Sequence, residues 1–269
     1  MLEVLTKAHP ILYPDEFRDD FIDFQTPLTN YKCFELPDIS VYQGQWRNNK
    51  RHGLGRIVYL DGGIYEGTWI SDVPSGFGRV IRRNGEMYEG YINDYKADGK
   101  GSLTSLDGYR YTGDWVEDKK HGTGEEYIEN SMYMYRGEFA HGLYHGQGLL
   151  KLHDGKVFDG TFVEGKFTGK GAYYSPASDD NQEQYEGDFV DWKKHGKGVY
   201  QLLNDGSRYE GDFVNDVPEG YGEFTYPDGT VFRGLWKNGK QHGIGEEINP
   251  DGVKREGEWV DGKWKRWVN

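Results

Sequence analysis

Cysteine, aliphatic side chains and long apolar runs are all scarce in this chain of 269 residues. The single cysteine, Cys33, excludes an intrachain disulfide and a zinc site built from several thiolates, and it favours a reducing compartment. Only 35% of the residues are hydrophobic, which is little for the core of an ordinary globular domain. The sequence shows no secretory signal and no apolar run of membrane-spanning length. These absences predict a protein that is cytosolic or attached to an intracellular structure. The location we expect is the cytoplasm, the cytoskeleton or a cilium or flagellum axoneme.

Basic side chains are also in the minority, with 32 Lys and Arg against 45 Asp and Glu and a net charge of −13. An acidic body is repelled by the phosphates of nucleic acids and by anionic lipid surfaces. The sequence therefore predicts no nucleic-acid partner. Membrane lipid is disfavoured for the same reason, although Lys263, Lys265 and Arg266 form a local basic cluster.

The chain is rich in a repeated motif, Tyr-x-Gly-x-Trp, which first appears as Tyr42-Gln-Gly44-Gln-Trp46. Its ten central glycines are separated by 23, 23, 23, 24, 23, 27, 24, 23 and 23 residues. A Gly-x-Gly motif follows nine residues after each of the first nine central glycines, and most repeats also contain Asp-Gly or Asn-Gly. A fixed period of this length predicts a repeat array, in which a single unit cannot fold alone.

The three motifs together predict one β-hairpin per repeat. Tyr, Gly and Trp at alternate positions share one face of a strand, and the residues between them are mostly polar. The Gly-x-Gly strand leaves space on that face for aromatic rings of a neighbouring strand, and Asp-Gly is a strong hairpin signal. We therefore expect an all-β, elongated, single-layer antiparallel β-meander.

The motifs resemble MORN repeats (membrane occupation and recognition nexus) over residues 41–262. The resemblance implies a curved half-pipe with an aromatic-lined groove, a binding or scaffolding role, and no attached catalytic domain or cofactor. Departures include Ile92 in place of the second aromatic residue of the third repeat and Arg255 in place of the first in the tenth. We accordingly divide the chain into an acidic segment, 1–40, and a repeat array, 41–269.

The acidic segment lacks the repeat and carries eight Asp and Glu against three Lys and Arg. Residues 14–24 are expected to form a short helix, because Pro14 suits the first helical position and acidic residues follow it. Phe17, Phe21 and Phe24 then make one apolar stripe. This docking stripe either caps the open end of the array or anchors a partner.

Catalytic and metal-binding signals are accounted for by the repeat. Five histidines, such as His121 and His145, occupy the same position before Gly-x-Gly. In a strand ladder they lie about 10 Å apart, too far for one zinc ion, and we expect them to hydrogen-bond within the hairpin turns. Carboxylates such as Glu186 and Glu210 are expected to face solvent. We predict no enzyme activity, no metal site and no cofactor.

The function predicted from the sequence is a non-enzymatic scaffold, acting as a rigid spacer and protein-binding platform in a cytoskeletal or ciliary assembly. The partners are expected to be helices or peptides of other proteins in a multi-subunit complex, and a homodimer stays open. The alternative is a peripheral membrane or phosphoinositide-binding protein. The aromatic side chains expected to grip a partner, unless they form an intramolecular core, are Tyr65, Trp69, Tyr88, Tyr111, Trp115, Tyr135 and Phe139.

Overall fold

The structure is a computed structural model that describes residues 22–268 except 24, 27, 130 and 177–181. The chain divides into two compact units, residues 1–130 with 139–142 and residues 131–138 with 143–269. The described residues form strands and turns, with one 3-10 turn, η2 (Leu28–Asn30). None of them belongs to an apolar helix of bilayer-spanning length. All three residues of the predicted stripe, Phe17, Phe21 and Phe24, and all of the predicted helix except residues 22 and 23 lie outside the described residues.

The first unit is a meander in which each strand pairs antiparallel with the next strand in the sequence. Its strands are β1 (Cys33–Glu35), β2 (Val41–Arg47), β3 (Lys50–Val58), β4 (Ile64–Ile70), β5 (Val73–Ile81), β6 (Met87–Asn93), β7 (Lys96–Thr104), β8 (Tyr109–Val116) and β9 (Lys119–Ile128).

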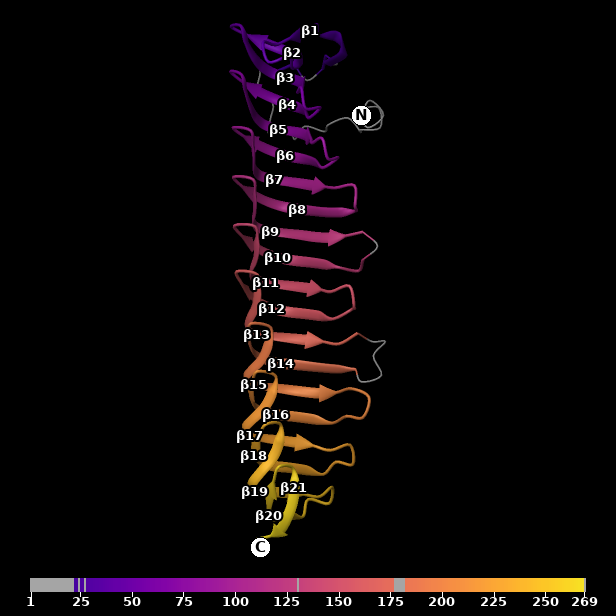
Figure 1. Ribbon diagram of the computed structural model, residues 1–269, viewed down its shortest axis with the longest axis vertical. Helices are drawn as coiled ribbons and strands as arrows, with labels where there is room; N and C mark the ends of the chain where they lie inside the picture. The colour runs from indigo at the N-terminus through magenta and orange to yellow at the C-terminus, as the bar shows by residue number, and fades with distance from the viewer. Residues whose placement is uncertain (1–21, 24, 27, 130, 177–181, 269) are drawn as a thin grey trace. The chain divides into compact units, whose positions relative to one another are not determined.

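The second unit repeats this plan, and β10 (Met134–Ala140) contributes residues to both units. Its pairing again follows the order of the chain (Figure 1). The strands are β11 (Leu143–Lys151), β12 (Val157–Val163), β13 (Lys166–Tyr174), β14 (Glu183–Val190), β15 (Lys193–Leu202), β16 (Arg208–Val214), β17 (Val217–Thr225), β18 (Val231–Lys237), β19 (Lys240–Ile248), β20 (Lys254–Val260) and β21 (Lys263–Trp267).

Two kinds of turn alternate along each unit and lie on opposite edges of it (Figure 1). The narrow turns have two residues with positive φ, as at Asn48 and Asn49 with φ of 51° and 59°. This is the mirror-image turn geometry that suits the twist of a tight hairpin. The wide turns contain Asp-Gly: at residues 59–63 the Tyr59 amide donates to the Gly63 carbonyl over 2.8 Å. The Asp-Gly signal therefore marks the wide turn, and the tightest hairpins carry other residues.

The narrow turns of successive repeats are hydrogen-bonded to one another. In the first unit the amide of Asp118 donates to the carbonyl of Ala97 over 3.0 Å, one repeat back. In the second unit the amide of Asp216 donates to the carbonyl of Lys194 over 2.9 Å. Each repeat is thus tied to the preceding one at its turn as well as through its strands.

One face of each unit, the aromatic face, carries the tyrosine and tryptophan of every motif. Tyr111 shows the arrangement: its hydroxyl donates to the Asp114 carbonyl over 2.9 Å, and its ring meets Trp115 and Phe139 edge to face at 5.0 Å. The ring lies over Gly124, where a Cβ would come within 2.5 to 2.7 Å of it. Edge-to-face contacts of this kind add about 0.5–1.5 kcal/mol per pair beyond area burial.

The sequence prediction of an all-β antiparallel meander with one hairpin per repeat is confirmed. The predicted reason for the Gly-x-Gly motif also holds, because its second glycine makes room for a ring. The elongated half-pipe shape of the whole array stays a prediction.

Candidate binding groove on the polar face

The seven aromatic side chains that the sequence analysis assigned to partner binding are at most 6% exposed. They are Tyr65, Trp69, Tyr88, Tyr111, Trp115, Tyr135 and Phe139. Their neighbours include other rings and main-chain glycines, as at Tyr65, which meets Trp69 at 5.2 Å. The structure therefore supports an intramolecular core for these rings, and a role in gripping a partner stays a prediction.

The opposite face of each unit, the polar face, carries the residues between the motif positions in two parallel rows. The narrow-turn row holds the middle residues of Gly-x-Gly and Gly-x-Trp, such as Lys170 and Asp188, which are directly opposed. The wide-turn row holds the middle residue of Tyr-x-Gly and the residue after Gly-x-Gly, such as Glu186 and Ala172. The glycines of the motifs lie between the two rows.

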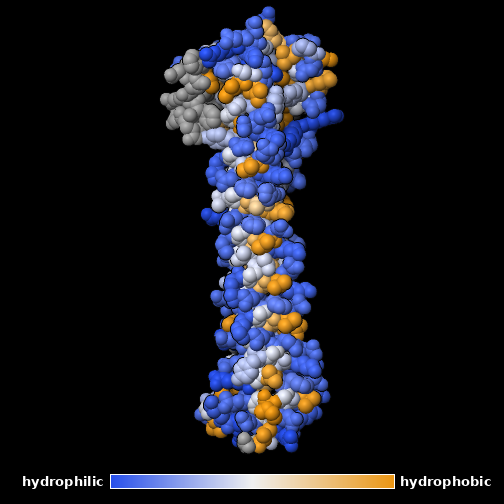
Figure 2. All heavy atoms as spheres, turned by 90° about the vertical axis from the view of Figure 1, so that its left-hand side faces the viewer, coloured by the Kyte–Doolittle hydropathy of each residue, from blue (hydrophilic) through white to orange (hydrophobic). Residues whose placement is uncertain are grey.

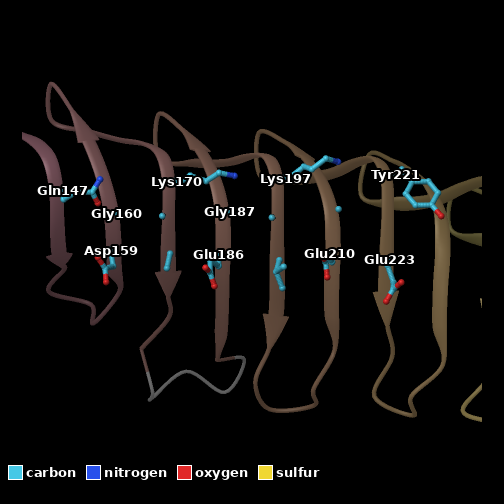
Figure 3. A pocket seen from close by; sticks show the side chains of 15 residues that line it. Gln147, Asp159, Gly160, Lys170, Glu186, Gly187, Lys197, Glu210, Tyr221 and Glu223 are labelled. Carbon is cyan, nitrogen blue, oxygen red and sulfur yellow. The ribbon is translucent and has the colours of Figure 1, made fainter.

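In the second unit the polar face is hollowed into a groove of about 980 Å³. The glycines of strands β12 to β16 form its floor, so the floor is main chain without side chains. These are Gly160, Gly171, Gly187, Gly198 and Gly211. Figure 3 shows Lys170, Lys197 and Tyr221 along one side of the groove and Asp159, Glu186, Glu210 and Glu223 along the other. The register of the hairpins that form the groove shifts at a bulge after a floor glycine, as between Gly187 and Asp188.

The narrow-turn row of the groove consists of ion pairs between neighbouring strands. Lys170 lies 2.7 Å from Asp188, and Lys197 lies 2.8 Å from Asp212. The hydrogen bond from Lys170 holds the pKa of Asp188 below its ordinary value. Both lysine side chains are highly exposed, so these pairs contribute little to stability and their charges remain accessible.

The wide-turn row of the groove is acidic. Asp159, Glu186 and Glu210 are all exposed and stand on every second strand, with Ala172 and Val199 between them. Glu210 pairs with Arg208 at 2.5 Å. Among the described residues, Asp159 and Glu186 have no ion-pair partner within 4 Å. The row thus presents carboxylates to whatever enters the groove.

The repeated histidines contact neighbouring turns. Nδ1 of His52 accepts a hydrogen bond of 3.4 Å from the Ser71 amide, in the narrow turn of the next hairpin. Nδ1 of His242 lies 3.6 Å from the carboxylate of Asp261, again one repeat on. Within the part of the chain that the structure describes, no three His, Cys, Asp or Glu side chains are placed to hold a metal ion.

Apolar side chains are also exposed beside the narrow turns, on the edge seen in Figure 2. In the second unit they include Leu143, Val163, Val190 and Val214, each 43–49% exposed. Figure 2 shows orange hydrophobic groups along this edge with blue hydrophilic residues around them. Separate apolar residues are normal on protein surfaces, and this edge is not hollowed like the groove.

The groove residues were not identified from the sequence, which assigned binding to the aromatic positions. Glu186 and Glu210 were expected to face solvent, and they do. The available signal was the middle residue of Gly-x-Gly, read down the repeats: in the second unit it is Gln147, Lys170, Lys197, Tyr221 and Ile244. These positions change in chemical character from repeat to repeat, whereas the glycines of the motif are kept.

A single-layer meander of similar hairpins, with a buried aromatic face and an accessible polar groove, defines a β-repeat protein. The chain belongs to the MORN repeat family, a class of repeats for protein or membrane binding. The family model matches nine repeats, at residues 42–64, 65–87, 88–108, 111–132, 135–157, 158–179, 185–206, 209–231 and 232–254.

Among curated proteins, the chain is similar to Alsin of Rattus norvegicus, with 35% identity over 89 residues. The match covers 33% of this chain and 5% of Alsin, so the chain spans a small part of that relative. Two solved structures were also matched at low similarity. The TCP10 domain of Danio rerio CPAP has a TM-score of 0.36 and 14% identity, covering 88% of this chain and 99% of that one.

The second is the SAS-4 (dCPAP) TCP domain of Drosophila melanogaster in complex with a proline-rich motif of Ana2, with a TM-score of 0.22 and 13% identity. It covers 92% of this chain and 97% of that one. At these TM-scores neither likeness supports a functional conclusion.

Proposed function

We propose that this chain is a non-enzymatic scaffold that binds a partner protein in the polar groove of its second unit. The groove between the two rows of the polar face carries the proposal, because its main-chain floor and exposed charged walls are open to a ligand. The repeats supply a firm support, since every hairpin is fixed by ring contacts, strand pairing and turn-to-turn hydrogen bonds.

More specifically, the proposed role of the chain is that of a rigid spacer and binding platform in a cytoskeletal or ciliary assembly of the cytoplasm. Family membership supports the binding role. Rigid repeats can hold bound partners at set intervals, which is what such an assembly requires. The proposed cytoskeletal or ciliary location follows from this requirement for regular spacing.

The lipid-binding alternative has one specific observation in its favour. Strand β21 exposes Lys263, Lys265 and Arg266 together with Trp264, a combination suited to an anionic membrane surface. The groove itself has the wrong sign for such a surface, because Asp159 and Glu186 face outward. Co-sedimentation with anionic vesicles at low salt tests it, and we expect the protein to stay in the supernatant.

A native pull-down with bulky groove variants tests the scaffold proposal. Ala172→Trp with Val199→Trp fills the groove, and we expect it to remove the proteins that the wild-type chain recovers. The matched control is Ser102→Trp with Thr112→Trp, directly opposed residues on the wide-turn row of the first unit. Recovery of the same proteins by the groove variant, or their loss in both variants, would contradict the proposal.

A further inference from the structure

The groove of the second unit continues into an exposed apolar patch on the same narrow-turn row. Tyr221, Leu235 and Ile244 lie on the successive strands β17, β18 and β19 and are 59%, 50% and 49% exposed. Tyr221 and Leu235 are directly opposed across the strand pair, and Tyr221 also lines the groove. At the equivalent positions of the first unit, Leu54 and Thr68 are only 5% and 1% exposed.

The polar face of the first unit already holds a segment of the chain. The side-chain amide of Gln43 donates to the Tyr31 carbonyl over 2.8 Å, and that of Gln45 donates to the Asp23 carbonyl over 2.6 Å. Gln43 and Gln45 are the wide-turn and narrow-turn residues of β2. The two rows of this face can therefore bind a peptide, and in the second unit they are open.

The charges on the two open rows of the second unit determine which kind of ligand is complementary to them. Lys170 and Lys197 are each paired with an aspartate, whereas Asp159 and Glu186 have no ion-pair partner among the described residues. A ligand with positive charge is complementary to this surface. The chain's own residues 1–40 carry eight acidic side chains against three basic ones, so they have the wrong sign to fill it.

The spacing of the carboxylates matches a helix. Asp159, Glu186 and Glu210 are two strands apart from one another, which corresponds to ~9.6 Å. Seven residues of an α-helix rise ~10.5 Å. In the first unit the side-chain amides of Gln43 and Gln45 bond the carbonyls of the segment held there, whereas the wide-turn row of the groove offers only carboxylates, Ala172 and Val199. A helix bonds its own backbone and needs no such donors.

We propose that the second unit binds an amphipathic, basic α-helix of a partner protein along this surface. The helix places Lys or Arg at every seventh position against Asp159, Glu186 and Glu210, and an aliphatic or aromatic residue near one end against Tyr221, Leu235 and Ile244. From β12 to β19 the surface spans seven strand spacings, ~34 Å, which corresponds to a helix of ~22 residues. The inference rests on the proposed scaffold function and specifies the chemistry of its partner.

Fluorescence anisotropy with the full chain and three labelled helical peptides of about 22 residues tests the inference. The first has Lys at every seventh position and Leu at one end, the second has Glu in place of Lys, and the third lacks the Leu. We expect only the first to bind tightly and the third to bind more weakly. The affinity of the first peptide should fall at least about tenfold between 0.1 and 1 M salt, because the Debye length shortens from about 10 to 3 Å.

Variants of the chain locate the binding. The double variant Glu186→Lys with Glu210→Lys should lower the affinity for the Lys peptide at least about tenfold. The same variant should bind the Glu peptide, which the wild-type chain does not. The milder Asp159→Asn and Leu235→Ser serve if the double variant does not fold. Glu125→Lys, on the wide-turn row of the first unit, is the matched control and should bind like wild type.

Three outcomes would overturn the inference: equal binding of the Lys and Glu peptides, Lys-peptide affinity that the groove variants leave unchanged, or binding of anionic vesicles instead of any peptide. The pull-down separates it from the scaffold proposal. If the tryptophan variants remove partner proteins but no basic peptide binds, the scaffold stands and the basic helix is wrong. If no basic peptide binds and the tryptophan groove variant still recovers the same partner proteins as the wild type, both proposals fail.

Discussion

The wide-turn rows of the two units are built from the same repeat positions but differ in charge. In the first unit arginine and glutamate alternate on successive strands: Arg56 pairs with Glu66, and Arg79 pairs with Glu89. In the second unit the row from β12 to β16 contains carboxylates separated by Ala172 and Val199. The first unit thus neutralises these charges in pairs, whereas Asp159 and Glu186 of the second unit have no ion-pair partner among the described residues.

The aromatic faces, in contrast, follow one plan. Tyr111 in the first unit and Tyr185 in the second each donate to the carbonyl three residues on, at 2.9 and 3.0 Å. Each also meets two neighbouring rings edge to face. The comparison teaches that the fold depends on the aromatic face, while the polar face is free to vary and can acquire a binding role.

The largest expected effect is alkaline unfolding, which should strike both units alike. Burial raises the pKa of Tyr111 and of Tyr185 above the ordinary value. A raised folded-state pKa means that this stability is fully present below pH ~10 and is lost as the pH rises above it. Hydrogen exchange across a pH series, with tyrosinate absorbance, measures the loss in each unit. Tyr111→Phe and Tyr185→Phe should each weaken the pH dependence of the stability of the unit that carries the substitution. A loss of stability at high pH in only one wild-type unit would contradict the shared plan of the two aromatic faces.

The next effect is a glycine substitution beneath a ring. Gly124→Ala and Gly198→Ala place a Cβ closer than van der Waals contact to the buried rings of Tyr111 and Tyr185, so ring or backbone must shift. We expect each to lower the free energy of unfolding by about 3 kcal/mol. Thermal denaturation checks this, and a loss below ~1 kcal/mol at either site would show that the ring moves aside.

Charge reversal should separate the two units. Glu66→Lys faces Arg56 and Arg79 and removes a half-buried ion pair, so we expect a loss of about 2 kcal/mol. Glu186→Lys removes no ion pair among the described residues, and its stability should change by less than about 0.5 kcal/mol. Chemical denaturation of both variants compares them. Equal losses would mean that the second row also serves stability.

The smallest effect concerns the exposed lysines of the narrow-turn rows. Lys100 in the first unit pairs with Asp114 at 2.5 Å, as Lys170 does with Asp188 in the second. Both lysines are largely exposed, so Lys100→Met and Lys170→Met should each cost less than about 0.5 kcal/mol. Matched melting curves decide this. A larger cost at only one site would reveal a structural role for that pair.

Much of the fold follows from the sequence, because alternation and glycine spacing fix which residues share a face. The position of Gly124 beneath the Tyr111 ring could be anticipated from Gly-x-Gly alone. The groove could not, since it depends on which side chains stand beside the glycine floor across strands β12 to β16, an arrangement that no single repeat shows. The burial of rings such as Trp69 also required the neighbouring repeat, because the Trp69 ring packs against Tyr42 of the preceding repeat.

The hydrogen bonds between successive narrow turns determine how a unit responds to tension. Strands that pair in chain order are loaded one hairpin at a time when a unit is stretched from its ends, so its bonds break in sequence rather than together. Each 23-residue repeat that opens releases about 75 Å of extended chain. The turn-to-turn bonds, such as that from Asp118 to Ala97, must break before a repeat can open. Such a unit would keep its length under low force and lengthen repeat by repeat only when the force exceeds what these bonds and the strand pairing resist.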